Sequence, residues 1–315
     1  MKKLNAYDKI NAASLALPSP EWRRVQKARK ATTQFDVPLV EMPTETRTLN
    51  GRQVRLAEAG PANAPLVVLL GPFPESILSF MASWETLTST FRVVAIDMPG
   101  FGASEGDRND MSPNALGDHL AAIFDELDLT NIHLVGPDVG MGAALAYATN
   151  HGEARLASLT VGHGPGAPGP FKLAILLDLM TKSKALRTMS GLLGAGPLVA
   201  LSYMLGAVRH RVNPVQVDDF KTSYAGRASE VVFWFEDFRE KAADLSTRVP
   251  NITVPTLIFW GEHDVMFDVS NAEHLHEALP NSKLQVIAHA GHFSWSDQPE
   301  IFAEMITEWV KTQIS

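Results

Sequence analysis

The feature that most constrains the fold is the pentapeptide Gly136-Pro137-Asp138-Val139-Gly140, which joins two segments of different character. Ile132 to Val135 before it has the composition of a buried strand, and Met141 to Ala148 after it has that of a closely packed helix. Glycines on both sides of the turn permit close strand–helix packing, and aspartate tolerates a positive φ better than most residues do. The pattern therefore predicts a strand, a sharp turn and a helix, with Asp138 at the apex.

An aspartate at this apex favours one kind of chemistry. The spacing is that of a nucleophile elbow, G-x-nucleophile-x-G, in which the usual residue is serine. A carboxylate that attacks a carbonyl carbon would form an anhydride, whereas one that attacks a saturated carbon forms an alkyl ester that water can hydrolyse. Asp138 thus indicates an epoxide or a carbon–halogen bond as substrate. The alternative is an ordinary surface turn, or an Asp N-cap of the following helix.

Two further polar clusters follow apolar runs downstream. Val254–Trp260 is a predicted buried strand that leads to Asp264, and the run Leu284–Ala288 leads to His292. The ends of parallel strands are the usual place for sites in open α/β sheets. The order nucleophile, acid, histidine is also the one that the elbow predicts. We therefore expect Asp138, Asp264 and His292 to form a catalytic triad.

Each member of the triad has an expected role. Asp138 is ionised at neutral pH and needs no activation. His292 is expected to deprotonate the water that attacks the ester, and Asp264 to hold the imidazole in the correct tautomer. Asp268 and His289 are the nearby rivals for these two roles.

A loop after another predicted strand supplies backbone donors. The apolar run Leu66–Leu70 opens into Gly71-Pro72-Phe73-Pro74-Glu75-Ser76. We expect the N–H of Phe73 and that of Val139 to form an oxyanion hole for the tetrahedral intermediate of ester hydrolysis. The alternative is a plain proline-rich loop between a strand and a helix.

These motifs together resemble the α/β-hydrolase superfamily, in its aspartate-nucleophile branch of epoxide hydrolases and dehalogenases. The resemblance covers roughly residues 45 to 313. It implies an α/β fold with a mostly parallel central sheet, flanking helices and a helical cap insertion. Epoxide hydrolases often have His-Gly where this chain has Gly71-Pro72. The segments that carry the resemblance are LLGPFPES (69–76), FRVVAIDMPGFGAS (91–104), IHLVGPDVGMGAALAYA (132–148), PTLIFWGEHD (255–264) and HAGHFSWSDQPE (289–300).

The chain divides into three predicted parts. Residues 1–43 form an N-terminal extension with a basic cluster, expected to be a solvated helix packed on the body. Residues 44–163 and 251–315 form the predicted α/β-hydrolase core. Residues 164–250 form the predicted helical cap, because their apolar residues have helical spacing and Gly-Pro pairs interrupt them.

The cap should supply the residues that contact substrate. Epoxide opening requires a donor for the leaving oxygen, which in the family is usually a cap tyrosine. Phe235, after Trp234, stands where the family often has such a tyrosine. We expect Trp234 and Tyr203 to bind substrate, with Tyr203 as replacement acid and His210 behind it. The alternative for Tyr203 is a half-buried aromatic residue of the cap.

Two other classes of function stay open. Haloalkane dehalogenases hold halide with a Trp directly after the nucleophile, where this chain has Val139. Haloacetate dehalogenases have D-R-G-G-R where this chain has Asp138-Val139-Gly140-Met141-Gly142, so an acid substrate would lack its bidentate partner. A non-hydrolytic member of the fold, lyase-like or purely binding, is the third possibility.

Composition excludes several partners. The 315 residues are 45% hydrophobic with a net charge of −8, which argues against a nucleic-acid or anionic-membrane partner. The chain has no cysteine, and we expect neither a metal nor a cofactor. The substrate should be a small apolar organic molecule; the sequence does not indicate an oligomeric state.

Two stretches bear on location. Asp8 and Lys9 interrupt the apolar run that a signal peptide needs, so we expect a cytoplasmic protein. The uncharged stretch Thr188–Val208 is long enough to span a membrane, but three glycines and Pro197 break it. We expect it to form apolar walls of the cap and not a stable membrane insertion.

Overall fold

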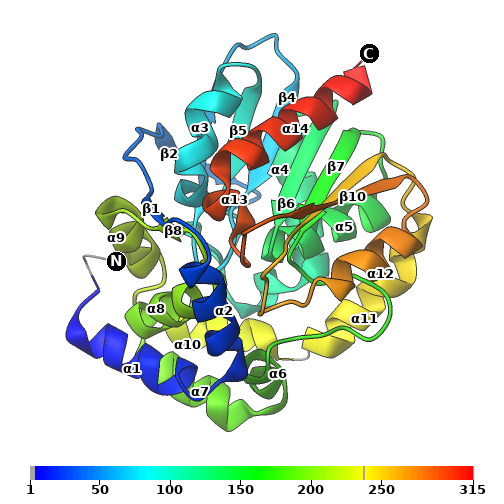
Figure 1. Cartoon of the computed structure of the whole chain (residues 1–315). Coiled ribbons are helices and arrows are strands. Elements are labelled where there is room, and N and C mark those ends of the chain that lie inside the picture. The colour runs from blue at the N-terminus through cyan, green and yellow to red at the C-terminus, as the bar shows by residue number, and fades with distance from the viewer. Residues whose placement is uncertain (1–3, 237, 315) are drawn as a thin grey trace.

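A mixed sheet of eight strands organises the molecule (Figure 1). The computed structural model describes residues 4–236 and 238–314, and within them the strand order is β10-β9-β7-β6-β4-β5-β3-β2. β3 pairs antiparallel with β2 and β5, and the other neighbours are parallel. The strands are β2 (Thr44–Leu49), β3 (Arg52–Ala59), β4 (Leu66–Leu70), β5 (Arg92–Ile96), β6 (Ile132–Pro137), β7 (Leu156–Gly162), β9 (Thr256–Gly261) and β10 (Ser282–Ile287).

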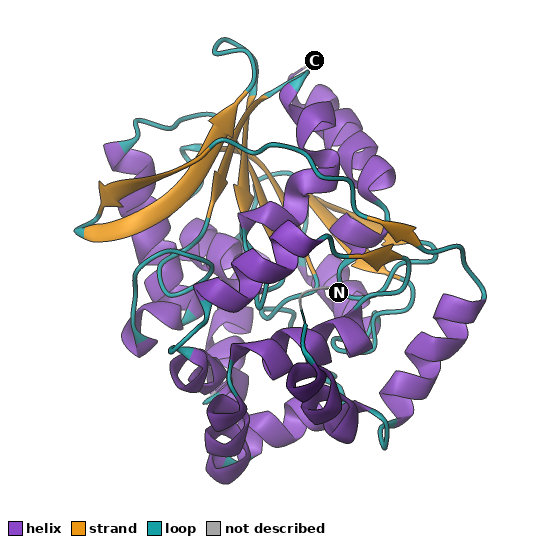
Figure 2. Ribbon diagram, turned by 90° about the vertical axis from the view of Figure 1, so that its left-hand side faces the viewer, coloured by secondary structure: helices purple, strands orange, loops and turns teal. Residues whose placement is uncertain are grey.

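Helices cover both faces of this sheet (Figure 2). Most of them follow a strand and return the chain to the start of the next parallel strand, as parallel connections require. They are α3 (Met81–Thr88), α4 (Pro113–Glu126), α5 (Val139–His151), α11 (Phe238–Arg248), α12 (Ser270–Ala278) and α14 (Pro299–Ile314), with short turns η1 (Ile77–Phe80), η2 (Arg108–Met111), η4 (Val249–Asn251) and α13 (Ser294–Asp297).

Strand β4 shows why the central strands are unbroken apolar runs. Val67 and Leu69 belong to one buried cluster, together with side chains of α3 and α14. Val68 and Leu70 belong to a second cluster, together with side chains of α4 and α5. A strand covered on both faces must be apolar at every position, and the alternation seen in half-exposed strands is lost. Because β4, β6, β7, β9 and β10 run parallel, the loops that follow them meet at one edge of the sheet.

The chain between β7 and β9 is helical, as predicted for residues 164–250. Its last helix, α11, packs against α4 and α5 of the sheet layer, while the others form a separate layer at one end of the molecule (Figure 1). The division of the chain into core and cap remains a prediction. The elements are α6 (Ile175–Lys182), α7 (Lys184–Leu193), α8 (Ala195–Gly206), β8 (His210–Arg211), α9 (Pro214–Ser223), α10 (Ala228–Val231), η3 (Val232–Phe235) and α11.

The N-terminal segment packs on this helical layer. Its helices α1 (Ala6–Ala16) and α2 (Pro20–Lys30) both contact α8, and its strand β1 (Phe35–Asp36) pairs in parallel with β8. Asn5 caps α1 with a capping box, and Ser19 caps α2. The basic cluster is solvated except for Arg29, whose guanidinium donates to the carbonyl oxygens of Tyr203 and Ala207.

Within the described residues, no single helix is long and apolar enough to cross a membrane. Together α7 and α8 meet the requirements of length and composition, but the chain bends by 108° between them.

We predict that Gly136→Ala will lower the free energy of unfolding by about 3 kcal/mol, because overpacking in a tight interior costs that order of energy. A Cβ at Gly136 would lie 2.3 Å from the carbonyl oxygen of Gly140. At Gly51, which has φ of 70° and no atom near its Cβ position, alanine should cost only about 1 kcal/mol through backbone conformation. Denaturant titration of the two variants measures both values, and equal losses would contradict the packing argument.

Candidate active site

Asp138 lies at the turn between β6 and α5, with φ of 54° and ψ of −122°. Its N–H donates to the carbonyl oxygen of Gly162 over 2.9 Å, which ties the turn to β7. A Cβ on residue 164 would lie 2.0 Å from the carbonyl oxygen of Asp138, so only glycine fits at position 164. The strand, turn and helix predicted around Asp138 are all present.

The two oxygens of the Asp138 carboxylate have different partners. Oδ2 accepts a hydrogen bond from the backbone N–H of Phe73 over 2.7 Å, and Oδ1 lies 3.4 Å from Nε2 of His292. Asp138 is 3% exposed, so both interactions are shielded from bulk water. Val139 is the first residue of α5, where a backbone N–H has no acceptor within the helix. That the N–H of Val139 is the second donor of the oxyanion hole stays a prediction.

Asp264 connects His292 to the loop after β9. Oδ2 of Asp264 lies 3.0 Å from Nδ1 of His292, and Oδ1 accepts the N–H groups of Met266 and Phe267. The ring of Phe267 stacks on the imidazole of His292, with 5.3 Å between the centroids. These contacts fix both the carboxylate and the plane of the imidazole.

The rival residues lie elsewhere. Asp268 accepts the N–H and the hydroxyl of Ser270 at the start of α12 and therefore serves as a turn residue. His289 is exposed, and its backbone N–H donates to Glu262. Asp138, Asp264 and His292 are thus the three predicted residues that the structure brings together.

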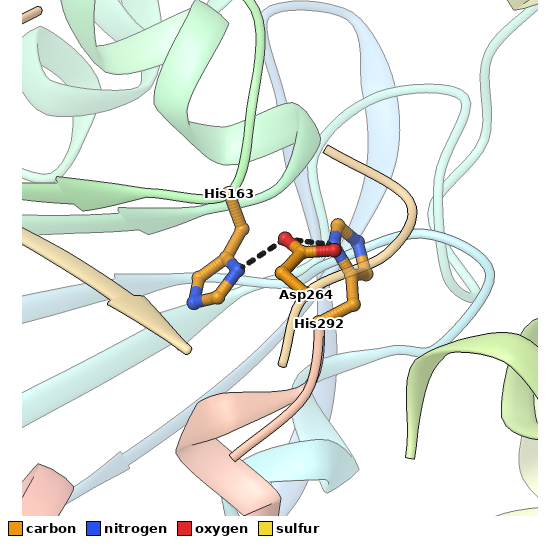
Figure 3. A group of neighbouring side chains, drawn as sticks. All are labelled: His163, Asp264 and His292. Carbon is orange, nitrogen blue, oxygen red and sulfur yellow. Dashed lines mark hydrogen bonds and ion pairs between the residues drawn. The ribbon is translucent and has the colours of Figure 1, made fainter. Parts of the chain in front are cut away.

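His163 is a fourth member of this cluster that the sequence analysis did not identify (Figure 3). It follows β7, is fully buried, and its Nδ1 lies 2.8 Å from the same oxygen of Asp264 that contacts His292. The N–H of Gly261 donates to Nε2 of His163, so the ring proton is on Nδ1 and points at Asp264. The hydroxyl of Ser294 also contacts Nε2. The available signal was the position of His163 at a strand end, which it shares with the other three.

The charges in the cluster shift the pKa values of the two histidines in opposite directions. Burial alone would lower the pKa of His292, but the carboxylates of Asp264 and Asp138 raise that pKa to about 10. Burial lowers the pKa of His163, more than its contact with Asp264 raises it. Burial would raise the pKa of Asp264, but the two histidines hold it well below its usual range. The resting site therefore contains an imidazolium at His292 and a neutral imidazole at His163.

Two groups of side chains have ligand atoms close enough to hold a metal ion: His163 with Asp264 and His292, and Glu262 with His263 and His289. In the first group, the donor to Nε2 of His163 directs the proton of Nδ1 at Asp264, where a metal would need a lone pair. The hydrogen-bonded triad accounts for that arrangement.

An apolar cavity opens above Asp138 and His292. Its walls come from α6, α7, α8 and η3, and Leu15 of α1 adds a side chain from the N-terminal segment. The described residues that line it include no Lys, Arg or Glu, and Asp138 is its only carboxylate. The uncharged stretch Thr188–Val208 contributes Ser190 together with apolar side chains such as Leu201 and Leu205, in agreement with its expected role as a wall.

The two predicted substrate-binding residues differ in placement. Trp234 lines the cavity, whereas the lining contains Leu201 and Ser202 in place of Tyr203. The hydroxyl of Tyr203 donates to Oε1 of Glu75 and is fully buried with it. The expectation that Tyr203 faces substrate is therefore not met. His210, the second choice, contacts Asp297 over 2.7 Å and is likewise outside the lining.

Glu75 is a buried carboxyl group next to the site. It accepts hydrogen bonds from Tyr203 and from the indole N–H of Trp295, over 3.0 Å in the second case. Burial raises the pKa of Glu75 to about 7 against the opposing effect of these bonds. Its backbone carbonyl accepts the hydroxyl of Tyr224. These contacts hold the loop in which Phe73 points its N–H at Asp138.

Comparison with known proteins identifies the family of the fold. Residues 65–299 match the family model described as the alpha/beta hydrolase fold. A 2-hydroxy-6-oxononadienedioate/2-hydroxy-6-oxononatrienedioate hydrolase of Burkholderia vietnamiensis is 24% identical over 89% of this chain and 96% of its own length.

Solved structures show the same fold. Haloalkane dehalogenase DbeA from Bradyrhizobium elkani has a TM-score of 0.74 at 16% identity, over 87% of this chain and 99% of the other. Epoxide hydrolase CorEH has a TM-score of 0.65 at 18% identity, over 86% and 99%. The predicted fold, a mostly parallel sheet flanked by helices, is confirmed.

We predict that Asp138→Asn will lower the pKa of His292, because it removes one of the two carboxylates that stabilise the imidazolium. A neighbouring charge of this kind typically shifts a pKa by about one to three pH units. NMR titration of labelled imidazole measures the pKa. Asp268→Asn, which changes a carboxylate without contact to His292, should leave the pKa unchanged; an unchanged value in Asp138→Asn would refute the pairing.

Proposed function

Given that the chain belongs to the α/β-hydrolase family, we propose that it hydrolyses an apolar epoxide through an alkyl ester on Asp138. Asp138 attacks a saturated ring carbon, the C–O bond of the ring breaks, and the ester of a hydroxyalkyl group forms. Water activated by His292 then cleaves the ester and releases a diol. No cofactor takes part in this scheme.

The observation that carries the proposal is that the two oxygens of Asp138 have different partners. Oδ2 accepts a hydrogen bond from the N–H of Phe73, and Oδ1 lies next to His292. Asp138 and His292 both line the cavity. A nucleophile that attacks through one oxygen keeps the other as the carbonyl oxygen of the ester. The N–H of Phe73 then stabilises the negative charge that develops on this oxygen when water attacks.

The charge balance supports two successive half-reactions. In the resting site, the imidazolium of His292 cannot accept a proton. Formation of the ester removes the negative charge of Asp138, which is one of the two charges that raise the pKa of His292. The pKa of His292 therefore falls when the intermediate forms, and the imidazole becomes able to deprotonate water. His163 acts through Asp264, which it helps to keep ionised and in place.

The cavity favours an uncharged substrate. A dicarboxylate, of the kind that the name of the Burkholderia vietnamiensis relative indicates for that protein, would need cationic partners. The one cation in the described lining is the imidazolium of His292, which is already paired with Asp138 and Asp264. The same argument disfavours a haloacid. Loop residues Phe73-Pro74-Glu75-Ser76 resemble those of epoxide hydrolases, and Val139 supplies no side-chain donor for a halide.

The leaving oxygen needs a hydrogen-bond donor on the side of the carbon opposite Asp138. Because Tyr203 is bound to Glu75, this role falls to Trp234, whose indole has no hydrogen-bond acceptor among the described residues. The indole stabilises the developing alkoxide. Water in the cavity relays to this alkoxide the proton that the imidazolium of His292 gives up as its pKa falls, so the imidazole is neutral when the ester has formed.

The same indole makes a haloalkane the second candidate substrate, because a halide ion leaves with a hydrogen bond alone and needs no proton. In that case, the product would be an alcohol and a halide, with the same ester on Asp138.

We expect His292→Gln to accumulate the ester. The variant retains the nucleophile and loses the base, so multiple turnover should fall by about 10²- to 10⁴-fold while a first equivalent of substrate still reacts. Mass spectrometry of the peptide with Asp138 should show the added mass of the epoxide. Asp138→Asn should show no adduct.

The oxygen source provides an independent check. In a single turnover of wild-type enzyme in heavy-oxygen water, the label should enter Asp138 and the product should carry unlabelled oxygen. Label that enters the product directly would mean that water attacks the epoxide and that no ester forms.

A substrate panel separates the two candidate classes. Aryl and alkyl epoxides should yield diols, and matched bromoalkanes and chloroalkanes should release little halide. Trp234→Phe should reduce turnover by about a hundredfold, as loss of one such donor typically does. Trp309→Phe is the matched control, because Trp309 is equally buried, lies on α14 and also has an unpartnered indole N–H. Halide release without diol would replace the epoxide assignment with the haloalkane one.

A further inference from the structure

Exposed apolar side chains gather at the end of the molecule where the cavity lies. Twelve large apolar side chains are exposed in the described part of the chain, and seven of these belong to α1, α6 and α7 or directly follow α1. Figure 1 shows these three helices together at the end of the molecule opposite the C-terminus. The seven, which we call the apolar rim, are Tyr7, Ile10, Leu17, Ile175, Leu179, Met189 and Leu192.

The helices that carry the apolar rim also line the cavity. On α1, Leu15 lines the cavity while Leu17, two residues on, is exposed; on α7, Leu193 lines it while Leu192 is 76% exposed. α6 likewise contributes lining side chains between its exposed ones. Each of the three helices therefore presents apolar residues both to the interior and to the outside.

Hydrogen bonds join these helices into one surface. The hydroxyl of Tyr7 on α1 donates to the carbonyl oxygen of Leu193 at the end of α7. Glu21 on α2 accepts the first N–H of α6, from Ile175, over 3.0 Å. The rim is thus built jointly by the N-terminal segment and the helices between β7 and β9.

The charge of α2 and of the three helices that carry the rim is opposite to that of the whole protein. α1, α2, α6 and α7 together contain nine Lys and Arg and three Asp and Glu, a net charge of +6 in a chain of −8. The acidic residues are neutralised or covered: Asp8 and Glu21 are buried, and Asp178 pairs with Lys182 and Arg239. Seven of the basic residues are exposed, namely Lys9, Arg23, Arg24, Lys27, Lys30, Lys182 and Lys184.

The basic residues lie next to the apolar rim. Arg24 borders the same surface hollow as Ile175 and Leu179, and Lys9 and Lys184 belong to the helices that carry the rim. Apolar side chains with cations beside them match a lipid surface with anionic headgroups, in which the former enter the acyl boundary and the latter contact phosphates.

We propose that this end of the protein adsorbs on the surface of an anionic lipid bilayer, with the cavity entrance facing the lipid. The net charge of −8 would argue against an anionic bilayer if the charge were spread evenly over the protein. Because the basic residues gather on α1, α2, α6 and α7, the charge distribution favours contact through these helices. An apolar substrate dissolved in the bilayer then enters the cavity without crossing water. The adsorption rests on the rim and its cations, and it holds whatever reaction Asp138 performs.

Flotation of the full chain with lipid vesicles tests the proposal directly. Vesicles of phosphatidylcholine with about one third phosphatidylglycerol should carry the protein upward at low salt, and vesicles of phosphatidylcholine alone should carry much less. Raising the salt to about 1 M should release it, because the Debye length falls to about 3 Å.

Matched variants locate the contact. Met189→Ser with Leu192→Ser should weaken binding about tenfold or more, since each removes a side chain that lipid would bury. Lys9→Gln with Lys184→Gln should weaken it about 25-fold, at about fivefold for each cation near the surface. Neither pair belongs to the cavity lining. The controls lie outside the rim, on β10 and α14: Val286→Ser with Ile314→Ser and Lys283→Gln with Lys311→Gln should bind as wild type does.

Three results would overturn the proposal. The first is a failure of wild-type protein to float with anionic vesicles at low salt, and the second is equal binding by the rim variants. The third is self-association: if sedimentation velocity shows a dimer that Met189→Ser with Leu192→Ser abolishes, the rim is an interface between two copies of the chain. All of these measurements are independent of enzymatic activity, so they stand or fall separately from the proposed reaction.

Discussion

The carboxylate of Asp264 is the interaction on which the geometry of the site depends. It accepts hydrogen bonds from two histidines through one oxygen and from two backbone N–H groups through the other. In this way it ties the end of β7, the loop after β9 and the loop after β10 to a single buried point. Because a buried carboxylate is stable only when its oxygens are well satisfied, the three loops hold one another in position.

The second constraint is the pairing of charge across His292. The imidazole lies between two carboxylates, and only one of them, Asp138, can lose its charge during the proposed reaction. The protonation state of the base is then coupled to the covalent state of the nucleophile. A serine at the apex would bring no such coupling, because its hydroxyl is neutral before attack.

Much of the core could be predicted because sheet position and sequence order agree. Asp138, Asp264 and His292 each follow an apolar run, and the carboxyl ends of parallel strands meet at one edge of a sheet. The same rule applies to His163 after β7. Its role was not predicted, because residue 163 served only as the end of the first predicted core segment, 44–163.

The cap side of the cavity could not be predicted to the same depth. The stretch Thr188–Val208 is apolar on every side, so no polar face fixes the rotation of α8, and the direction of Tyr203 depends on Glu75, 128 residues away in sequence. A helix can be inferred from such a stretch, but the partner of one of its side chains cannot. The N-terminal segment posed the same difficulty: its helices could be expected, but not their attachment to α8 and β8.

The contribution of Leu15 to the cavity has a consequence for how relatives of this chain should be compared. The family match begins at residue 65, yet one side chain that lines the cavity comes from a helix that ends at Ala16. Two proteins could therefore be identical throughout the matched region and still admit different molecules. In this chain the candidate catalytic residues and part of the surface that meets the substrate are encoded by separate segments, so either can change while the other is kept.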